Sequence, residues 1–106
     1  MRQMALSFAG VVELSHFNRA SFRINKRIFA TLDEKASIAV LMFSPLEQSV
    51  FCAFDTTIIY PVPGGWGRLG ATIFELHKIK KAMLKDALTV AYNETVNKTT
   101  KKKLDK

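Results

Sequence analysis

The sequence of 106 residues contains one cysteine, Cys52, and only two histidines, His16 and His77. A single thiol cannot form a disulfide within the chain, so the fold does not depend on oxidation. The neighbours of Cys52 are apolar, which favours a buried, inert thiol over a nucleophile. A zinc site needs three or four protein ligands, and two distant histidines with a buried thiol do not supply them. We therefore expect no metal ion and no cofactor.

Long apolar runs are also absent. The longest uninterrupted run covers residues 38–43, far short of the roughly 20 residues that span a bilayer. The apolar N-terminal stretch soon meets Glu13, which favours a first helix packed on the core over a signal peptide. The length fits one domain, and an apolar content of 48% is typical of globular proteins. We expect a cytoplasmic protein with no membrane partner.

The sequence lacks the patterns of an active site. It has neither a Gly-x-Ser-x-Gly elbow nor a paired-carboxylate pattern. The spacing of Gly65, Gly67 and Gly70 matches the dinucleotide-binding string, but that site requires a helix to open at its end. Residues 71–74 instead have the composition of a strand. The sequence therefore predicts a protein that is not an enzyme.

Positive charge is abundant and unevenly placed. The net charge is +7; residues 1–76 hold seven Lys and Arg against six acids, whereas residues 77–106 hold nine Lys against three acids. The segment 98–106 is polar and basic, which predicts a disordered tail after a single domain at 1–97. A second basic cluster has no acid among its nine residues and contains Arg19, Arg23, Lys26 and Arg27.

The hydrophobic patterns predict an α+β domain with two layers. Short connections between most elements favour an antiparallel sheet with helices packed on it, in the order α-β-β-β-α-β-β-α. The expected elements are a first helix at the N-terminus, a hairpin at 21–33, a strand at 37–43, a helix from Ser44, strands at 55–60 and 71–74, and a last helix at 76–96.

Local signals place the turns and caps. Asn25-Lys26 predicts a two-residue hairpin turn of type I′, which requires positive φ at both positions. Ser44 can cap a helix, Pro45 suits its first position, and Glu47 completes a capping box. Two prolines and four glycines between residues 60 and 70 predict a loop, because they disfavour both a helix and a central strand.

Trp66 and Arg68 stand in this loop and allow two interpretations. Trp66 can cover the edge of the core, or it can stack a base while Arg68 contacts a phosphate. In an extended segment both side chains would point to one face. Near the start of the last helix, Lys78, Lys80 and Lys81 oppose the helix dipole. An anionic partner would offset that cost, although solvent screening can do so as well.

The loop Tyr60-Pro-Val-Pro-Gly-Gly-Trp-Gly-Arg68 resembles the signature loop of the MmcQ/YjbR-like family. The resemblance implies a fold like that of secretion chaperones or frataxin, and DNA binding through two hairpins that project as a double wing. No catalytic residue is established for the family, so none is transferred. Further matches, in the family's order, are Ala5-Leu-Ser-Phe-Ala-Gly-Val11, Ser21-Phe-Arg-Ile-Asn25, Phe29-Ala-Thr-Leu-Asp-Glu34 and Ser44-Pro-Leu-Glu-Gln48.

We hypothesise that the protein binds nucleic acid with weak sequence specificity, mainly through phosphates, and that DNA is a better candidate partner than RNA. A protein-interaction or chaperone-like module, using an apolar surface beside the short first helix, is the alternative. A small-molecule site near residues 60–68 is a third. The candidate nucleic-acid-binding residues are Arg19, Arg23, Lys26, Arg27, Trp66, Arg68, Lys78, Lys81, Lys101, Lys102 and Lys103.

Overall fold

The computed structural model describes residues 1–16 and 18–104, and the side chains of residues 1–15 and 18–97. The helices and strands are α1 (Arg2–Leu6), β1 (Val12–His16), β2 (Arg19–Ile24), β3 (Arg27–Asp33), β4 (Ile38–Met42), α2 (Pro45–Phe54), β5 (Ile59–Pro61), α3 (Gly65–Arg68), β6 (Ala71–Glu75) and α4 (Lys81–Leu104).

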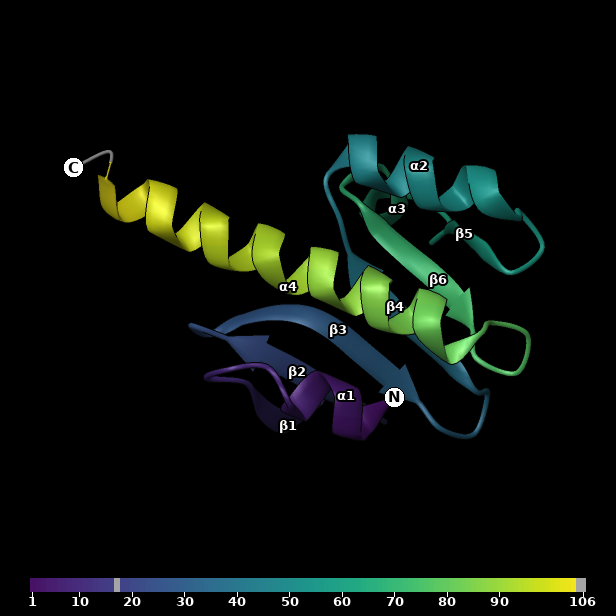
Figure 1. Ribbon diagram of the computed structural model, residues 1–106, viewed down its shortest axis with the longest axis horizontal. Helices are drawn as coiled ribbons and strands as arrows, with labels where there is room; N and C mark the ends of the chain where they lie inside the picture. The colour runs from purple at the N-terminus through teal and green to yellow at the C-terminus, as the bar shows by residue number, and fades with distance from the viewer. Residues whose placement is uncertain (17, 105–106) are drawn as a thin grey trace.

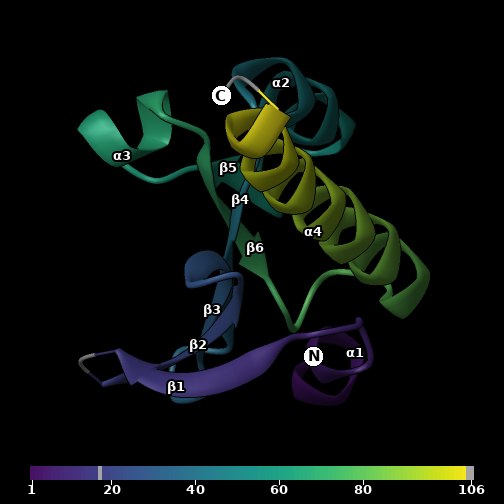
Figure 2. The ribbon, with the colours of Figure 1, turned by 90° about the vertical axis from the view of Figure 1, so that its left-hand side faces the viewer.

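The strands form one antiparallel sheet in the order β1-β2-β3-β4-β6-β5. Helices α1, α2 and α4 lie on one face of this sheet, and α3 lies on the other side (Figures 1 and 2). The predicted α+β class, with helices packed on an antiparallel sheet, is confirmed. The structure adds strand β1 and the short helix α3 to the expected order. Within the described residues, no helix is long and apolar enough to cross a membrane.

The core lies between the sheet and the helices. Along α4 the buried residues Leu84, Ala87, Leu88 and Ala91 follow the spacing i, i+3, i+4, i+7, which places them on one helical face. They pack against a sheet face rich in phenylalanine. The fully buried aromatic side chains of this core are Phe22, Phe29, Phe43 and Phe74.

Helix α4 differs from the expected 76–96 at both ends. It begins at Lys81, because the backbone N–H of Leu76 still bonds the Ser37 carbonyl at 2.9 Å and extends the strand pairing. It continues to Leu104, since lysine and leucine are good helix formers. The helix therefore overlaps the segment 98–106, where the composition predicts a disordered tail, and the domain boundary at residue 97 stays a prediction.

The Ser44 cap of α2 is confirmed, but the expectation that Glu47 completes a capping box is wrong. Ser44 Oγ accepts a hydrogen bond from the Glu47 N–H at 3.3 Å, and Pro45 takes the first helical position. In a full capping box Glu47 would bond the Ser44 N–H. Here the carboxylate of Glu94 on α4 accepts that N–H at 2.9 Å. The start of α2 is thereby attached to the long helix.

The turn between β2 and β3 has the predicted geometry. Asn25 has φ 52° and Lys26 has φ 68°, and the flanking residues Ile24 and Arg27 are paired. Positive φ at both central positions is the requirement of a type I′ turn. Lysine bears this conformation at a steric cost, because its Cβ approaches the backbone carbonyl.

Substitution of Lys26→Gly should stabilise the protein by up to about 1 kcal/mol, because glycine removes the left-handed strain at a modest entropic cost. Urea unfolding followed by circular dichroism measures the change. The matched control is Lys35→Gly, in the turn between β3 and β4, where the lysine does not have positive φ. That control should lose stability, and a gain in both variants would contradict the explanation.

Candidate nucleic-acid interface

The sheet face opposite α1, α2 and α4 is called the open face here. Pairing across the sheet aligns one side chain from every strand along it: Leu14, Ser21, Thr31, Val40, Ile73 and Tyr60. Side chains alternate between the two faces of a strand, and the neighbouring positions Phe22, Leu41 and Phe74 point into the core. In Figure 2, α3 and its flanking segments lie on the open-face side of the sheet, away from α1, α2 and α4.

An apolar groove of about 260 Å³ lies on the open face. Trp66 is 64% exposed and Leu69 is 72% exposed, so neither side chain is enclosed by the fold. Trp66 thus covers part of the sheet and also presents a large aromatic surface. The groove is lined by Ile28 and Thr31 of β3, Val40 and Met42 of β4, Val62, Trp66 and Leu69 of the 60–70 loop, and Arg19 of β2.

The loop contains a helical turn, so the expectation that residues 60–70 exclude a helix is wrong. The backbone N–H of Leu69 bonds the Gly65 carbonyl at 3.1 Å, which closes one turn of α3. Both prolines stand before this turn and do not interrupt it, and Pro61 belongs to the edge strand β5.

Helical geometry also separates the two candidate side chains of the loop. Residues i and i+2 are about 200° apart around a helix. Trp66 and Arg68 therefore point in different directions, whereas an extended segment would have aligned them. Trp66 lines the groove, and the exposed Arg68 does not.

The side chain of Gln48 holds this loop in place. Its Nε2 donates to the carbonyls of Gly67 at 2.8 Å and Ala71 at 3.2 Å, and to Thr72 Oγ1 at 3.1 Å. Helix α2 thereby fixes both ends of the segment that carries Leu69. Gln48 ends one of the family matches, but an amide on a helix carries no signal of its distant acceptors, so the sequence did not predict this role.

Two arginines from the basic cluster share the open face. Arg23 is in register with Val12 and Ile28, and its Nε donates to Ser21 Oγ at 3.1 Å. Arg19 lies at the start of β2 and lines the groove. Its Nε is 3.9 Å from Asp33 Oδ2, a long and weak ion pair. Both guanidinium groups therefore retain donors for an anionic ligand.

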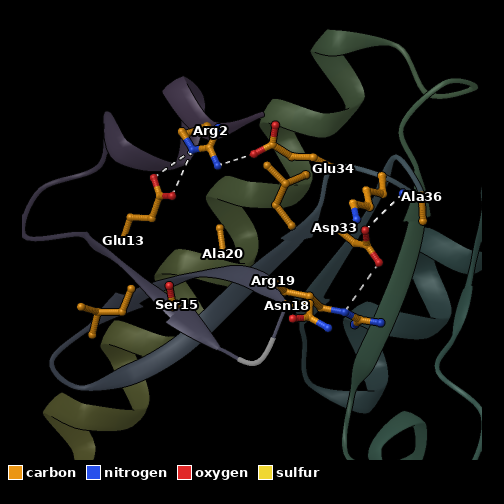
Figure 3. A pocket seen from close by; sticks show the side chains of 12 residues that line it. Arg2, Glu13, Ser15, Asn18, Arg19, Ala20, Asp33, Glu34 and Ala36 are labelled. Carbon is orange, nitrogen blue, oxygen red and sulfur yellow. Dashed lines mark hydrogen bonds and ion pairs between the residues drawn. The ribbon is translucent and has the colours of Figure 1, made fainter.

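A second hollow of about 890 Å³, with Arg19 at its border, is polar and more open (Figure 3). Here Arg2 bonds Glu34 at 2.5 Å and Glu13 at 2.9 Å, so its charge is already balanced. The hydrogen bonds to Glu34 and Glu13 raise the pKa of Arg2. This hollow contains a mixture of charges and is a poorer site for a polyanion than the groove.

The other candidate cations lie elsewhere. Lys26 is exposed at the hairpin turn. Arg27 pairs with the core residue Ile24, so it points to the face opposite that of Arg23. Lys78 lies in the turn after β6, near Asp55, and Lys81 is the first residue of α4. The side chains of Lys101, Lys102 and Lys103 lie outside the described residues.

Other site chemistries find little support within the described residues. Cys52 is half-buried, and burial raises the pKa of its thiol, which keeps it protonated. No group of three or more His, Cys, Asp or Glu in the described part of the chain is arranged to hold a metal ion. No protein-family model matches the chain, and no curated protein sequence matches it.

The position of Trp66 depends on close backbone packing at Gly67, where an added Cβ would lie 1.9 Å from the Val62 carbonyl oxygen. We expect Gly67→Ala to displace α3, shift the emission of Trp66 and cost about 1–3 kcal/mol of stability. The control is Gly65→Ala, whose Cβ would meet no atom within 4 Å. Fluorescence during urea unfolding measures both effects, and equal behaviour of the two variants would refute this packing role.

Proposed function

We propose that this chain is a non-enzymatic, MmcQ/YjbR-like domain that binds nucleic acid on the open face, mainly through phosphates. One observation carries the proposal: Arg19 and the largely exposed Trp66 line the same groove, on a sheet face that the helix layer does not cover. Arg23 adds a second cation to that face. DNA is the first partner to test, with RNA the alternative.

The charge distribution supports an anionic ligand. The chain carries a net charge of +7, and a protein that neutralises phosphates gains affinity by releasing counterions. Carboxylates near the open face already have partners. Glu75 accepts a hydrogen bond from the Tyr60 hydroxyl, which raises the pKa of Tyr60. Asp33 accepts the Ala36 N–H at 3.1 Å and lies near Arg19.

Weak sequence specificity follows from the same chemistry. Contacts with phosphates position a nucleic acid but carry no sequence information. Thr31, an uncharged polar residue that lines the groove, has a hydroxyl that both donates and accepts, so it can bond to any base. We therefore expect similar affinities for unrelated sequences of equal length.

The association constant should fall steeply as the salt concentration rises. A plot of the logarithm of the association constant against the logarithm of the salt concentration should have a slope of about −0.9 per phosphate neutralised on a duplex and about −0.7 on a single strand. Arg19→Ala and Arg23→Ala should each remove one phosphate contact. Each variant should make the slope less negative by about 0.9 on a duplex or about 0.7 on a single strand. Fluorescence anisotropy at several salt concentrations measures it.

The control for this experiment is Lys85→Ala, which removes an equal charge from the exposed surface of α4. Its slope should match that of the unmodified protein. If Lys85→Ala flattens the slope as much as the arginine variants do, net charge alone governs binding and the open face has no special role. Affinity that does not change with salt would refute the phosphate mechanism.

A protein-interaction module is the second candidate function, and helix α2 supplies its supporting observation. Leu46, Val50 and Phe54 are spaced four residues apart, so they form one stripe. Their exposed fractions are 73%, 59% and 62%. This apolar stripe lies on α2, whereas the sequence analysis placed the apolar surface beside the short first helix.

Copurification under two salt concentrations separates the two functions. Nucleic acid that is released by high salt supports the first function. A protein that remains bound at high salt supports the second, provided that Val50→Glu abolishes its retention, because a buried charge on the stripe is unfavourable. Val50→Glu should leave the affinity for nucleic acid within twofold of the original, since α2 lies on the other side of the sheet.

A further inference from the structure

We infer that the groove lined by Trp66 receives one unpaired base, so that the open face binds single strands in preference to duplexes. This inference rests on the proposed function, and it specifies the class of nucleic acid. A phosphate next to the base would contact Arg19, and Arg23 would contact the backbone farther along the strand.

The lining of the groove suits a flat aromatic ring. Its floor consists of branched and flexible apolar side chains, chiefly Ile28, Val40 and Met42. Trp66 and Leu69 stand beside the floor and leave much of their own surface exposed to solvent. A ring that packed against these side chains would remove its own apolar surface and theirs from water. Every base offers such a π-face, so the contact tolerates any sequence.

The size of the groove limits the occupant to one ring system. Its volume of about 260 Å³ falls below the roughly 300–1,000 Å³ of sites for drug-sized ligands. A base within a duplex is stacked and paired, so it must be flipped out at a cost of a few kcal/mol before it can enter. An unpaired base avoids this cost. The groove therefore favours single strands.

The two arginines match the spacing of a strand that runs across the face. Arg19 and Arg23 are four residues apart on β2, which corresponds to about 13 Å at a rise of about 3.3 Å per residue. A stacked strand rises about 3.4 Å per nucleotide, so this distance spans about four nucleotides. Arg19 lines the groove itself. A base in the groove would thus have a phosphate near Arg19, and Arg23 would hold the backbone farther along.

Trp66 reports occupancy of the groove directly, because it is the only tryptophan in the chain. The experiment titrates the protein with an unlabelled 12-nucleotide oligothymidylate, with the matching duplex, and with a 12-nucleotide strand of abasic sites. We expect the single strand to quench Trp66 emission and to bind about 5- to 150-fold more tightly than the abasic strand, which is the effect of one stacked base. The duplex should bind more weakly than the single strand and quench less.

Variants separate base stacking from phosphate binding. Trp66→Ala should lower the affinity for the single strand about 5- to 150-fold while the salt slope stays the same. Trp66→Phe should retain most of the affinity that Trp66→Ala loses. Because Trp66 is largely exposed, the fold should survive, and circular dichroism checks this. Leu69→Ala provides a second groove variant that keeps the fluorescent probe, and it should weaken quenching by the single strand.

The matched control is Phe54→Ala. Phe54 is an aromatic residue with an exposed fraction of 62%, close to that of Trp66, but it lies on α2. Its removal should leave both affinity and quenching unchanged. An equal loss in Phe54→Ala and Trp66→Ala would overturn the inference.

The remaining outcomes distinguish the inference from the proposed function. Salt-dependent binding that is unchanged by Trp66→Ala, or a duplex that binds as tightly as the single strand, overturns the inference and leaves the proposed function intact. Absence of binding to any polynucleotide overturns both. If thymidine monophosphate quenches Trp66 but no polynucleotide binds, the groove is a small-molecule site and the single-strand inference fails.

Discussion

The packing of α4 against one face of the sheet determines where a ligand can bind. A sheet of this size has two faces, and each needs cover for its apolar side chains. The helix layer buries Phe22, Phe29 and Phe74 on one side. On the opposite side, the 60–70 loop lies against Val40 and Met42 and leaves a groove. The candidate site therefore exists because the second layer of this domain is incomplete.

The incomplete layer is held by a few polar and steric contacts. Gln48 bonds three acceptors on the loop and β6, and Gly67 lets the loop backbone approach Val62. Gly70 has φ 109°, and an added Cβ there would lie 1.7 Å from the Phe43 carbonyl oxygen. These contacts attach the loop through its backbone, so the side chains of Trp66 and Leu69 remain free. Such an arrangement preorganises an aromatic surface without burying it.

The sequence contained enough information for most elements but not for the site. Periodicity and caps predicted the sheet, α2 and the turn at Asn25-Lys26, because these depend on residues close together in the chain. The groove depends on contacts between distant segments, such as Gln48 with Gly67. The apolar residues at 37–43 predicted a strand, and β4 occupies Ile38–Met42. This pattern could not indicate that a loop, rather than a helix, would cover the second face.

The basic cluster shows why charge in a sequence overstates charge at a site. In a helix, cations three or four residues apart share a face, but in a strand the faces alternate. Arg19 and Arg23 share the open face, whereas Arg27, across the turn, pairs with Ile24 and points to the other side. Of the four cations in the cluster, two therefore lie on the open face. The cations of the cluster are therefore divided between the two faces, and the groove itself combines one of them, Arg19, with the exposed indole of Trp66.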